Sequence, residues 1–328
     1  MDILPKYEIP FPNNIIINYD TDYSYDKYCE LKKLVYNEIH KKKLQLHWSN
    51  TEILYNVVAI FLYLSTWTYC FINANDLSYL WMVLLSVEFV GLCILIGHET
   101  AHYTGFKNQK YNKFISEIIN IPFFDIDDWK FYHNYAHHCF TNTKFDRDFI
   151  GSSKLIRFDP NSKLYINHKF QYIYAHILYL LNGYFTFSKS KIFIYTVKVI
   201  LIYIFGLLKM LLLFGLSSFQ YVTIATISHL NNECIQLNVN NKNDFLYNQV
   251  SSSMNYKTDD LITRFICFGL DIQIEHHLFP NIPHSSLRKT QHIVLTYCNK
   301  NNIPYIEKQN IFSALYSHII YLYKMSKE

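Results

Sequence analysis

Two kinds of cofactor signature are missing from this chain of 328 residues. No Gly-x-Gly-x-x-Gly fingerprint occurs, which excludes a dinucleotide-binding domain of the type that carries it. The seven cysteines are scattered without a Cys-x-x-Cys pair, so neither a disulfide framework, a zinc ribbon nor an iron–sulfur cluster is expected. No basic stripe with interleaved aromatic residues is present, and we therefore expect no nucleic-acid partner.

Half of the residues are apolar, and they come in long blocks that indicate an integral membrane protein. The first fifty residues lack the charged start, short apolar run and small-residue cleavage site of a signal peptide, so we expect insertion through internal spans. The net charge of +4 comes mostly from lysines near both ends and in polar breaks. This distribution suits a lipid membrane with an anionic face.

Apolar runs of about twenty residues, the second of which contains one charged residue, Glu88, are long enough to cross the roughly 30 Å hydrocarbon layer as helices. The first two such runs flank a polar break at 73–76, which contains no Lys or Arg and is therefore expected outside. The apolar block 192–227 would be about 54 Å long as a single helix, so we divide it at a turn near Lys209–Met210. We predict four transmembrane helices, at 53–72, 77–97, 192–208 and 211–227.

Two shorter apolar stretches are interpreted as interfacial helices. Residues 114–124 are too few to span, and a span at 170–187 would put Lys189 and Lys191 outside, against the positive-inside bias. The predicted fold is all-α, with a cytoplasmic N-terminal segment (1–50), one membrane-embedded domain (51–305) and an amphipathic C-terminal helix (306–328). Four spans bring the histidine-rich segments to one cytoplasmic face.

Histidines gather in three short clusters. His98 and His102 are four residues apart, so on a helix their imidazoles share one face. His133 and His137 repeat this spacing, with His138 as a further donor, and a Gln273-x-x-His276-His277 motif forms the third cluster. The candidate ligands are eight histidines together with Gln273: His98, His102, His133, His137, His138, His229, His276 and His277.

This donor set fits two metal ions better than one, because a zinc site uses only three or four ligands. Carboxylates are nearly absent from the clusters, so a two-iron centre here would be rich in histidine, unlike the Glu and Glu-x-x-His sites of soluble bundles. Acid–base chemistry alone does not need so many ligands. Redox chemistry with dioxygen does.

These motifs resemble the three histidine boxes of membrane fatty acid desaturases. They are His98-x-x-x-His102, the run 133–142 followed by Asp146-Arg147-Asp148, and Gln273-x-x-His276-His277-Leu-Phe-Pro-x-x-Pro-His284. The glutamine is similar to that of the front-end and linoleoyl-CoA desaturase-like branch, as is the segment 157–174. The chain departs from the usual pattern at Phe268-Gly269-Leu270-Asp271, where the family commonly has Gly-Gly-Leu-Asn, and at Arg147.

The resemblance implies an oxygen-dependent oxidoreductase that introduces a cis double bond into an acyl-CoA or acyl-lipid. Its cofactors would be two iron ions, with O2 as co-substrate and Gln273 as a catalytic residue at the centre. Many relatives carry a fused cytochrome b5 with a His-Pro-Gly-Gly motif, which does not occur here. A separate electron donor, cytochrome b5 or ferredoxin with its reductase, is therefore expected, with the basic surface near Arg288 and Lys289 as a candidate docking site. The site would face the cytoplasm, from the endoplasmic reticulum or a bacterial inner membrane.

An acyl tunnel is expected along the second span below His98, where Gly91 and Ile94 are the candidate substrate-binding residues. Gly91 would leave room for a chain, although close helix packing explains it equally well. Glu88, near mid-membrane, is interpreted as a hydrogen-bonded packing residue. We assign no function to His168, His176, His292 and His318, and we interpret His284 as turn packing.

Three alternatives remain open on the sequence. A hydroxylase of the same family could use the same centre to insert oxygen. An intramembrane zinc protease could use His98-Glu99-x-x-His102, with Glu99 as base, but this leaves two clusters unused. A membrane metal carrier is the non-enzymatic alternative.

Overall fold

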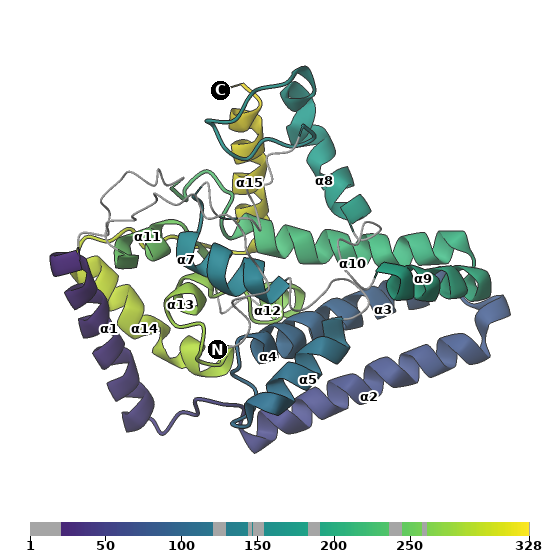
Figure 1. Cartoon of the computed structure of the whole chain (residues 1–328), viewed down its shortest axis with the longest axis horizontal. Coiled ribbons are helices and arrows are strands. Elements are labelled where there is room, and N and C mark those ends of the chain that lie inside the picture. Colours follow the sequence, from purple (N-terminus) through teal and green to yellow (C-terminus); the bar gives the residue numbers. More distant parts are fainter. Residues whose placement is uncertain are drawn as a thin grey trace.

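The computed structural model describes residues 21–120, 129–143, 146, 154–182, 191–235, 245–257 and 261–327. Helices dominate this part of the chain, as the sequence predicts, and three long ones run side by side from the histidine-rich end to the opposite end (Figure 1). In the described ranges the strands are β1 (Asn255–Tyr256) and β2 (Glu307–Lys308), which pair in parallel. The all-α expectation is therefore right apart from this short pairing.

The first helical hairpin is formed by α2 (Asn50–Ile72) and α3 (Tyr79–Leu92), joined through η2 (Ala74–Asp76). Ser49 starts α2 through a capping box with Glu52, and Ser78 caps α3 by accepting from the Leu80 N–H. Such caps satisfy backbone N–H groups that have no partner inside the helix. Beyond Leu92 the chain continues as the π-helix η3 (Cys93–His98) and α4 (Glu99–Ala101), so one apolar rod extends from Tyr79 to Ala101.

The second hairpin consists of α9 (Lys191–Phe205) and α10 (Leu207–Ile227). The predicted turn at Lys209–Met210 is wrong: the helices separate at Gly206, whose φ of +86° is a conformation open to glycine because it has no Cβ. Lys209 instead lies in the first turn of α10, and its Nζ donates to the Ala74 carbonyl at 3.4 Å. Both hairpin turns therefore meet at the end of the bundle away from the histidines.

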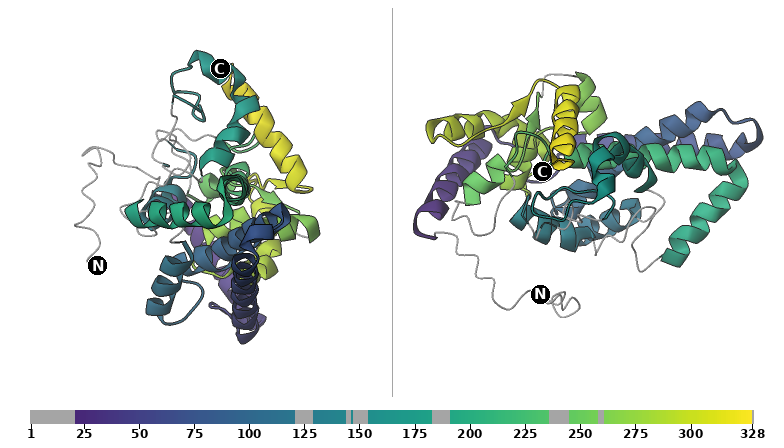
Figure 2. Two further views of the ribbon diagram at one scale, coloured as in Figure 1. Left: turned by 90° about the vertical axis from the view of Figure 1, so that its right-hand side faces the viewer. Right: turned by 90° about the horizontal axis from the view of Figure 1, so that it is seen from above.

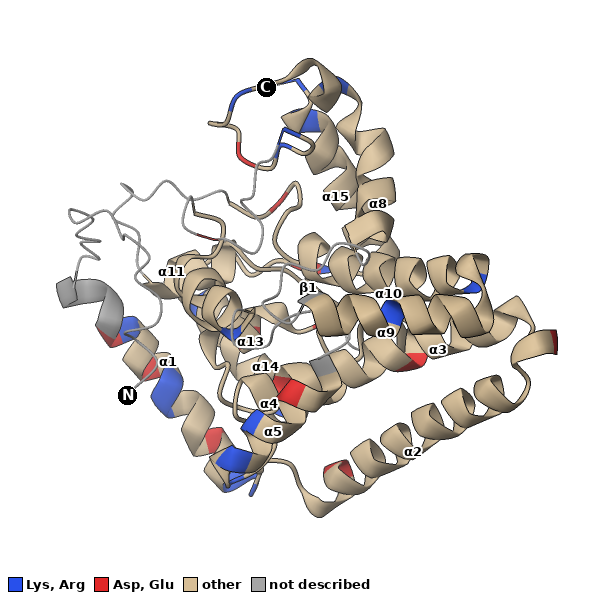
Figure 3. Cartoon of the chain, turned by 45° about the vertical axis from the view of Figure 1, so that its right-hand side comes forward, with Lys and Arg blue, Asp and Glu red and all other residues tan. Residues whose placement is uncertain are grey.

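Three helices are long and apolar enough to cross a membrane: Asn50–Ile72, Tyr79–Ala101 and Leu207–Ile227. Their surfaces are nearly free of charge, whereas α1 (Thr21–Lys41) carries both signs (Figure 3). Helix α9 has 15 residues, about 22 Å at 1.5 Å per residue, which is less than the hydrocarbon layer. It turns away from α10 beyond their shared end (Figure 2). The fourth span remains a prediction.

At the histidine-rich end, α1 and α14 (His284–Lys300) pack around the short helices α11 (Phe245–Ser251) and α13 (Gln273–Leu278). The apolar core between them includes Leu31, Val35, Ile274, Leu278 and Leu287, all buried. Burying side chains of this size stabilises each by about 1.5–3 kcal/mol. Because Ile274 and Leu278 flank the histidine pair, the same core fixes the position of α13.

Helices α8 (Gln171–Asn182) and α15 (Ile311–Met325) stand against the end of α10 nearest the histidines (Figure 1). Buried Arg157 joins them: its backbone N–H donates to Gln171 Oε1 at 2.8 Å, and its Nη1 donates to the Met325 carbonyl at 2.8 Å. Helix α5 (Gln109–Asn120) packs on η3 and begins five residues before the apolar stretch we interpret as interfacial. Neither α5 nor α8 is long enough to span.

The structure fills the space beside Gly91, where we expected a tunnel. A Cβ at this position would lie 2.9 Å from the Phe268 ring, so the glycine permits close approach of the segment after α12 (Leu261–Cys267). Ile94 is also buried in an apolar core, with Val90 and Ile224. The geometry therefore favours the close-packing interpretation. Glu88 accepts a hydrogen bond from Thr66 Oγ1 at 3.0 Å, which agrees with its interpretation as a packing residue.

We predict that Gly91→Leu destabilises the protein by about 1–3 kcal/mol through overpacking against Phe268. Phe268→Ala in the same chain should recover much of this loss, because the ring is the obstacle. Thermal unfolding of the two single variants and the double variant in detergent gives the coupling free energy. Simple additivity of the two substitutions would contradict the packing account.

Candidate metal centre

The histidine clusters lie on four elements that converge at one end of the bundle. The rod from α3 to α4 carries His98 and His102; η4 (Phe131–His137) and α7 (His138–Phe140) carry the second cluster; His229 follows α10; and α13 carries His276 and His277. Both η3 and η4 are π-helical, a form often found at functional sites. His133 and His276, which are 35 and 178 positions from His98 in the sequence, thus lie next to it in space.

The first group consists of His98, His102, His133 and His276, whose nearest ligand atoms all lie within 4.8 Å of one another. The Nε2 atoms of His98 and His133 are 3.1 Å apart. Nε2 of His102 and Nε2 of His276 are buried without a hydrogen-bond partner among the described residues. Buried imidazole nitrogens that converge, with lone pairs not used in hydrogen bonds, are the ligands that a borderline metal ion prefers.

The second group consists of His137, His229 and His277, again with ligand atoms within 4.8 Å. Each Nδ1 is held by an oxygen: Asp146 Oδ2 at 3.0 Å from His137, the Ser252 carbonyl at 3.0 Å from His229, and Gln249 Oε1 at 3.1 Å from His277. An acceptor at Nδ1 places the proton there and leaves the Nε2 lone pair for a metal. All three rings therefore have the same tautomer, with the proton on Nδ1 and the lone pair on Nε2.

His138 lies between the groups. Its Nε2 is 3.3 Å from Nε2 of His133 in the first group, and its ring stacks on His277 of the second at a centroid distance of 4.4 Å. The eight predicted histidines thus occupy one continuous volume. This arrangement fits two adjacent metal positions better than two positions that lie far apart.

Burial keeps these imidazoles neutral. It lowers the pKa of His102, His133, His138, His229, His276 and His277 well below the usual range, and the charges of neighbouring imidazoles lower it further. Metal-binding histidine must be neutral. The residues present therefore fit a pair of histidine-bound metal ions.

Helix α13 is fixed by the buried carboxylate of Glu275, which accepts from Tyr305 Oη and Asn255 Nδ2, both at 2.7 Å. Burial raises the pKa of Glu275 to about 7. Gln273 is buried in the first turn of α13, about one turn before the histidine pair. No hydrogen bond joins its amide to a histidine in the described part of the chain.

Glu99 does not act as the protease interpretation requires. Its carboxylate accepts hydrogen bonds from Trp48 Nε1 and from the His284 backbone N–H, and contacts His284 Nδ1. A general base must instead face a metal-bound water with a free lone pair. His98 and His102 also share their site with His133 and His276, which that interpretation leaves unused.

Several site residues escaped the sequence interpretation. Asp146 was noted as part of a motif without a role, although an acid shortly after a histidine cluster is a usable signal. Gln249 and Ser252 belong to no motif, so only the tertiary structure finds them. On the predicted docking surface, Arg288 forms two hydrogen bonds of 2.6 and 2.7 Å with buried Asp271, whereas Lys289 is exposed. Docking at this surface stays a prediction.

The fold and the site define a helical membrane protein with a histidine-rich candidate metal centre. The sequence model of the fatty acid desaturase family matches residues 77–309, more than half of the chain. The chain therefore belongs to the fatty acid desaturase family, and the family prediction is confirmed.

Curated relatives agree with this assignment. A Delta(8)-fatty-acid desaturase of Borago officinalis is 25% identical over 69% of this chain and 60% of its own. A Delta(8)-fatty-acid desaturase of Euglena gracilis is 27% identical over 70% of this chain and 66% of its own. The sn-1 linoleoyl-lipid 6-desaturase of Synechocystis sp. is 22% identical over 75% and 79%. The chain spans about three fifths of the length of the Borago relative.

We predict that Asp146→Asn weakens metal binding about 10- to 100-fold, the usual effect of losing a carboxylate that orients a ligating histidine. One carboxylate oxygen, Asp146 Oδ2, accepts from both His137 Nδ1 and the Asn142 backbone N–H, at 3.0 and 2.9 Å. The asparagine carbonyl could take both hydrogen bonds but is an uncharged and weaker acceptor, so it holds the His137 ring less firmly. Metal retained per chain after dialysis against a graded chelator measures this. Asp159→Asn is the control, since that carboxylate bonds Asn161. Equal retention in both variants would argue against the role of Asp146.

Proposed function

We propose that the protein is an oxygen-dependent fatty acyl desaturase that introduces a cis double bond into an acyl chain. The observation that carries this is the convergence of seven histidines into two adjoining groups with His138 between them, and the oxygen acceptors at the Nδ1 atoms of the second group. A membrane protein of this family with such donors is best suited to two iron ions. When bound, these would supply the oxygen-activating redox chemistry.

The residues of the chain have distinct tasks in this proposal. The first group, with His98, His102, His133 and His276, and the second, with His137, His229 and His277, would each hold one iron, with His138 between them. Asp146, Ser252 and Gln249 hold the rings in orientation. The apolar cores around Ile94 and Ile274 exclude water, which protects a redox site from side reactions. Gln273 would act at the centre through its amide, as a weak ligand or a hydrogen-bond donor.

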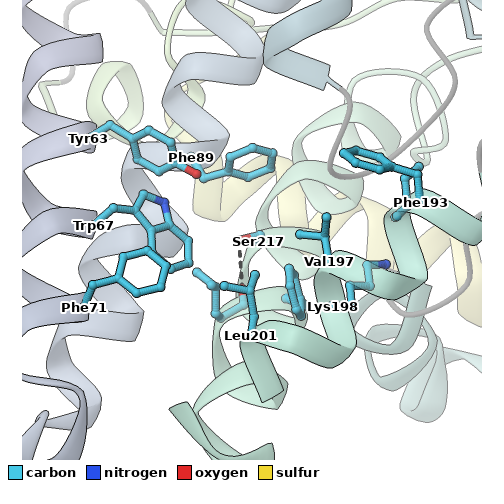
Figure 4. A pocket seen from close by; sticks show the side chains of 12 residues that line it. Tyr63, Trp67, Phe71, Phe89, Phe193, Val197, Lys198, Leu201 and Ser217 are labelled. Atoms are coloured by element: carbon cyan, nitrogen blue, oxygen red, sulfur yellow. Dashed lines mark hydrogen bonds between the residues drawn. The ribbon is translucent and has the colours of Figure 1, made fainter. Parts of the chain in front are cut away.

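An apolar cavity of about 310 Å³ lies between α2, α3, α9 and α10. Tyr63, Trp67 and Phe71 of α2 face Phe193 and Leu201 of α9 across it (Figure 4). The lining is almost entirely hydrocarbon and aromatic, which suits an acyl chain or a lipid tail. We propose this cavity, rather than the packed face at Gly91, as the place for apolar substrate within the bundle.

Electrons would come from a separate donor protein, cytochrome b5 or ferredoxin with its reductase. The substrate would be an acyl-CoA or acyl-lipid reached from the membrane. The hydroxylase alternative is not favoured, because the curated relatives are named as desaturases.

Iron content and product formation together test the proposal. We expect about two iron ions per chain in the wild type, as in other di-iron carboxylate or histidine sites, and formation of an unsaturated acyl product with a reducing partner and O2. His276→Ala and His277→Ala should lose both iron and product. Gln273→Ala should lose product while most iron remains, because the histidines still hold the ions. Normal turnover of Gln273→Ala would remove that residue from the centre, and one zinc per chain in place of iron would overturn the proposal.

The four-span topology makes a separate prediction. In a background with the native cysteines replaced, single cysteines at Asn75 and Asn108 should react with a membrane-impermeant reagent from opposite sides, Asn108 from the cytoplasm. The reason is that Asn75 lies at the end of the bundle away from the histidines, whereas Asn108 follows the first cluster. A cysteine at Gly206 should behave like the one at Asn75. Labelling of all three from one side would contradict the topology.

A further inference from the structure

The carboxylate of Glu99 links α4 to the start of α14. Its Oε1 accepts from the His284 backbone N–H at 2.8 Å and lies 2.6 Å from Nδ1 of the same residue. Its Oε2 accepts from Trp48 Nε1 and, at 3.4 Å, from Thr104 Oγ1. A negative charge at the first turn of α14 also suits the helix dipole. His284 is thereby fixed through both its backbone and its ring.

This contact decides the tautomer of His284. A carboxylate oxygen only accepts, so in the neutral imidazole Nδ1 carries the proton and Nε2 has the lone pair. That Nε2 is buried and has no hydrogen-bond partner in the described ranges. The His284 side chain is only 11% exposed and this atom is buried, so Nε2 has lost its hydrogen bond to water. Such an unsatisfied group requires an explanation.

The position of the ring supplies one. The His284 imidazole stacks on His276 with centroids 4.9 Å apart, and its centroid is 5.6 Å from that of His98. Both neighbours belong to the first histidine group. Helix α14, which begins at His284, packs on α13, which carries His276, and is hydrogen-bonded to Glu99 of α4 (Figure 1). The ring that carries this nitrogen therefore adjoins two rings of the first group.

We propose that His284 is a further ligand of the metal ion held by the first group, and that Glu99 is the carboxylate that orients it. The proposal rests on the proposed function, since it adds a donor to the same centre. Metal-ligating histidines usually donate their other ring N–H to a carboxylate or carbonyl, as Glu99 and His284 do here. His284 also supplies an imidazole nitrogen in a chain whose third cluster contributes an amide at Gln273, which is a weaker ligand for iron.

The test compares two substitutions of His284 in the full-length, iron-loaded protein purified in detergent. His284→Ala removes the nitrogen and the ring, whereas His284→Phe removes the nitrogen but keeps an aromatic ring against His276. A ligand role predicts that both fall from about two to about one iron per chain. It also predicts that added imidazole restores iron to His284→Ala but not to His284→Phe, whose ring fills the space.

X-ray absorption at the iron edge gives a readout besides activity, because it reports the average number of imidazole ligands per metal. His292→Ala is the matched control, on the same helix and with its side chain 56% exposed; it should keep iron and spectrum unchanged. Glu99→Gln should weaken iron retention about 10- to 100-fold, since an amide places an N–H against either Trp48 Nε1 or His284 Nδ1.

Each outcome has one meaning. Wild-type iron content and spectrum in His284→Ala would overturn the ligand role while leaving the desaturase proposal intact. Retained iron in His284→Phe with loss in His284→Ala would also overturn it, because stacking alone would then be sufficient. A wild-type protein that holds no iron would instead refute the proposed function.

Discussion

The structure depends on keeping many unprotonated imidazoles together in one buried volume. In His137, His229, His277 and His284 the Nδ1 atom has an oxygen acceptor, which leaves the lone pair of the neutral ring on Nε2. The acceptors come from distant segments: Asp146 after the second cluster, Ser252 and Gln249 around α11, and Glu99 on α4. The loops and short helices at this end are therefore arranged by hydrogen bonds to Nδ1 atoms as much as by apolar packing.

The long helices provide the frame for this arrangement. Helices α3 and α10 pack along their length and deliver His98 and His229 to the same end. Buried apolar residues of these helices, such as Ile94 and Ile224, form an apolar core below the histidines. Because burial is what lowers the pKa of the imidazoles outside the spans, the apolar frame and the neutral donor set have one physical origin.

Side chains of the segment that departs from the family pattern contact other parts of this chain. Phe268 has a φ of +49°, which costs a residue with a Cβ about 1–2 kcal/mol, and its ring covers Gly91. Asp271 is buried against the guanidinium of Arg288, which ties this segment to α14. Gly91, a candidate for substrate binding on the sequence, therefore permits close packing, and Arg288, part of the candidate docking surface, also forms an ion pair within the chain.

The sequence alone determined the family, the helical class, the hairpin of α2 and α3 and the identity of the eight clustered histidines, because helical periodicity, apolar run length and histidine spacing are local properties. It did not determine the break at Gly206, since a single glycine in a uniform apolar block gives no sign of its φ. It also could not show that Phe268 fills the space at Gly91, or that Glu99 turns His284 towards the first group, because these contacts join residues 177 and 185 positions apart. Tertiary packing decided those roles, because Glu99 fixes the tautomer of His284 and Phe268 fills the space at Gly91 as neighbours in space that are distant in the sequence.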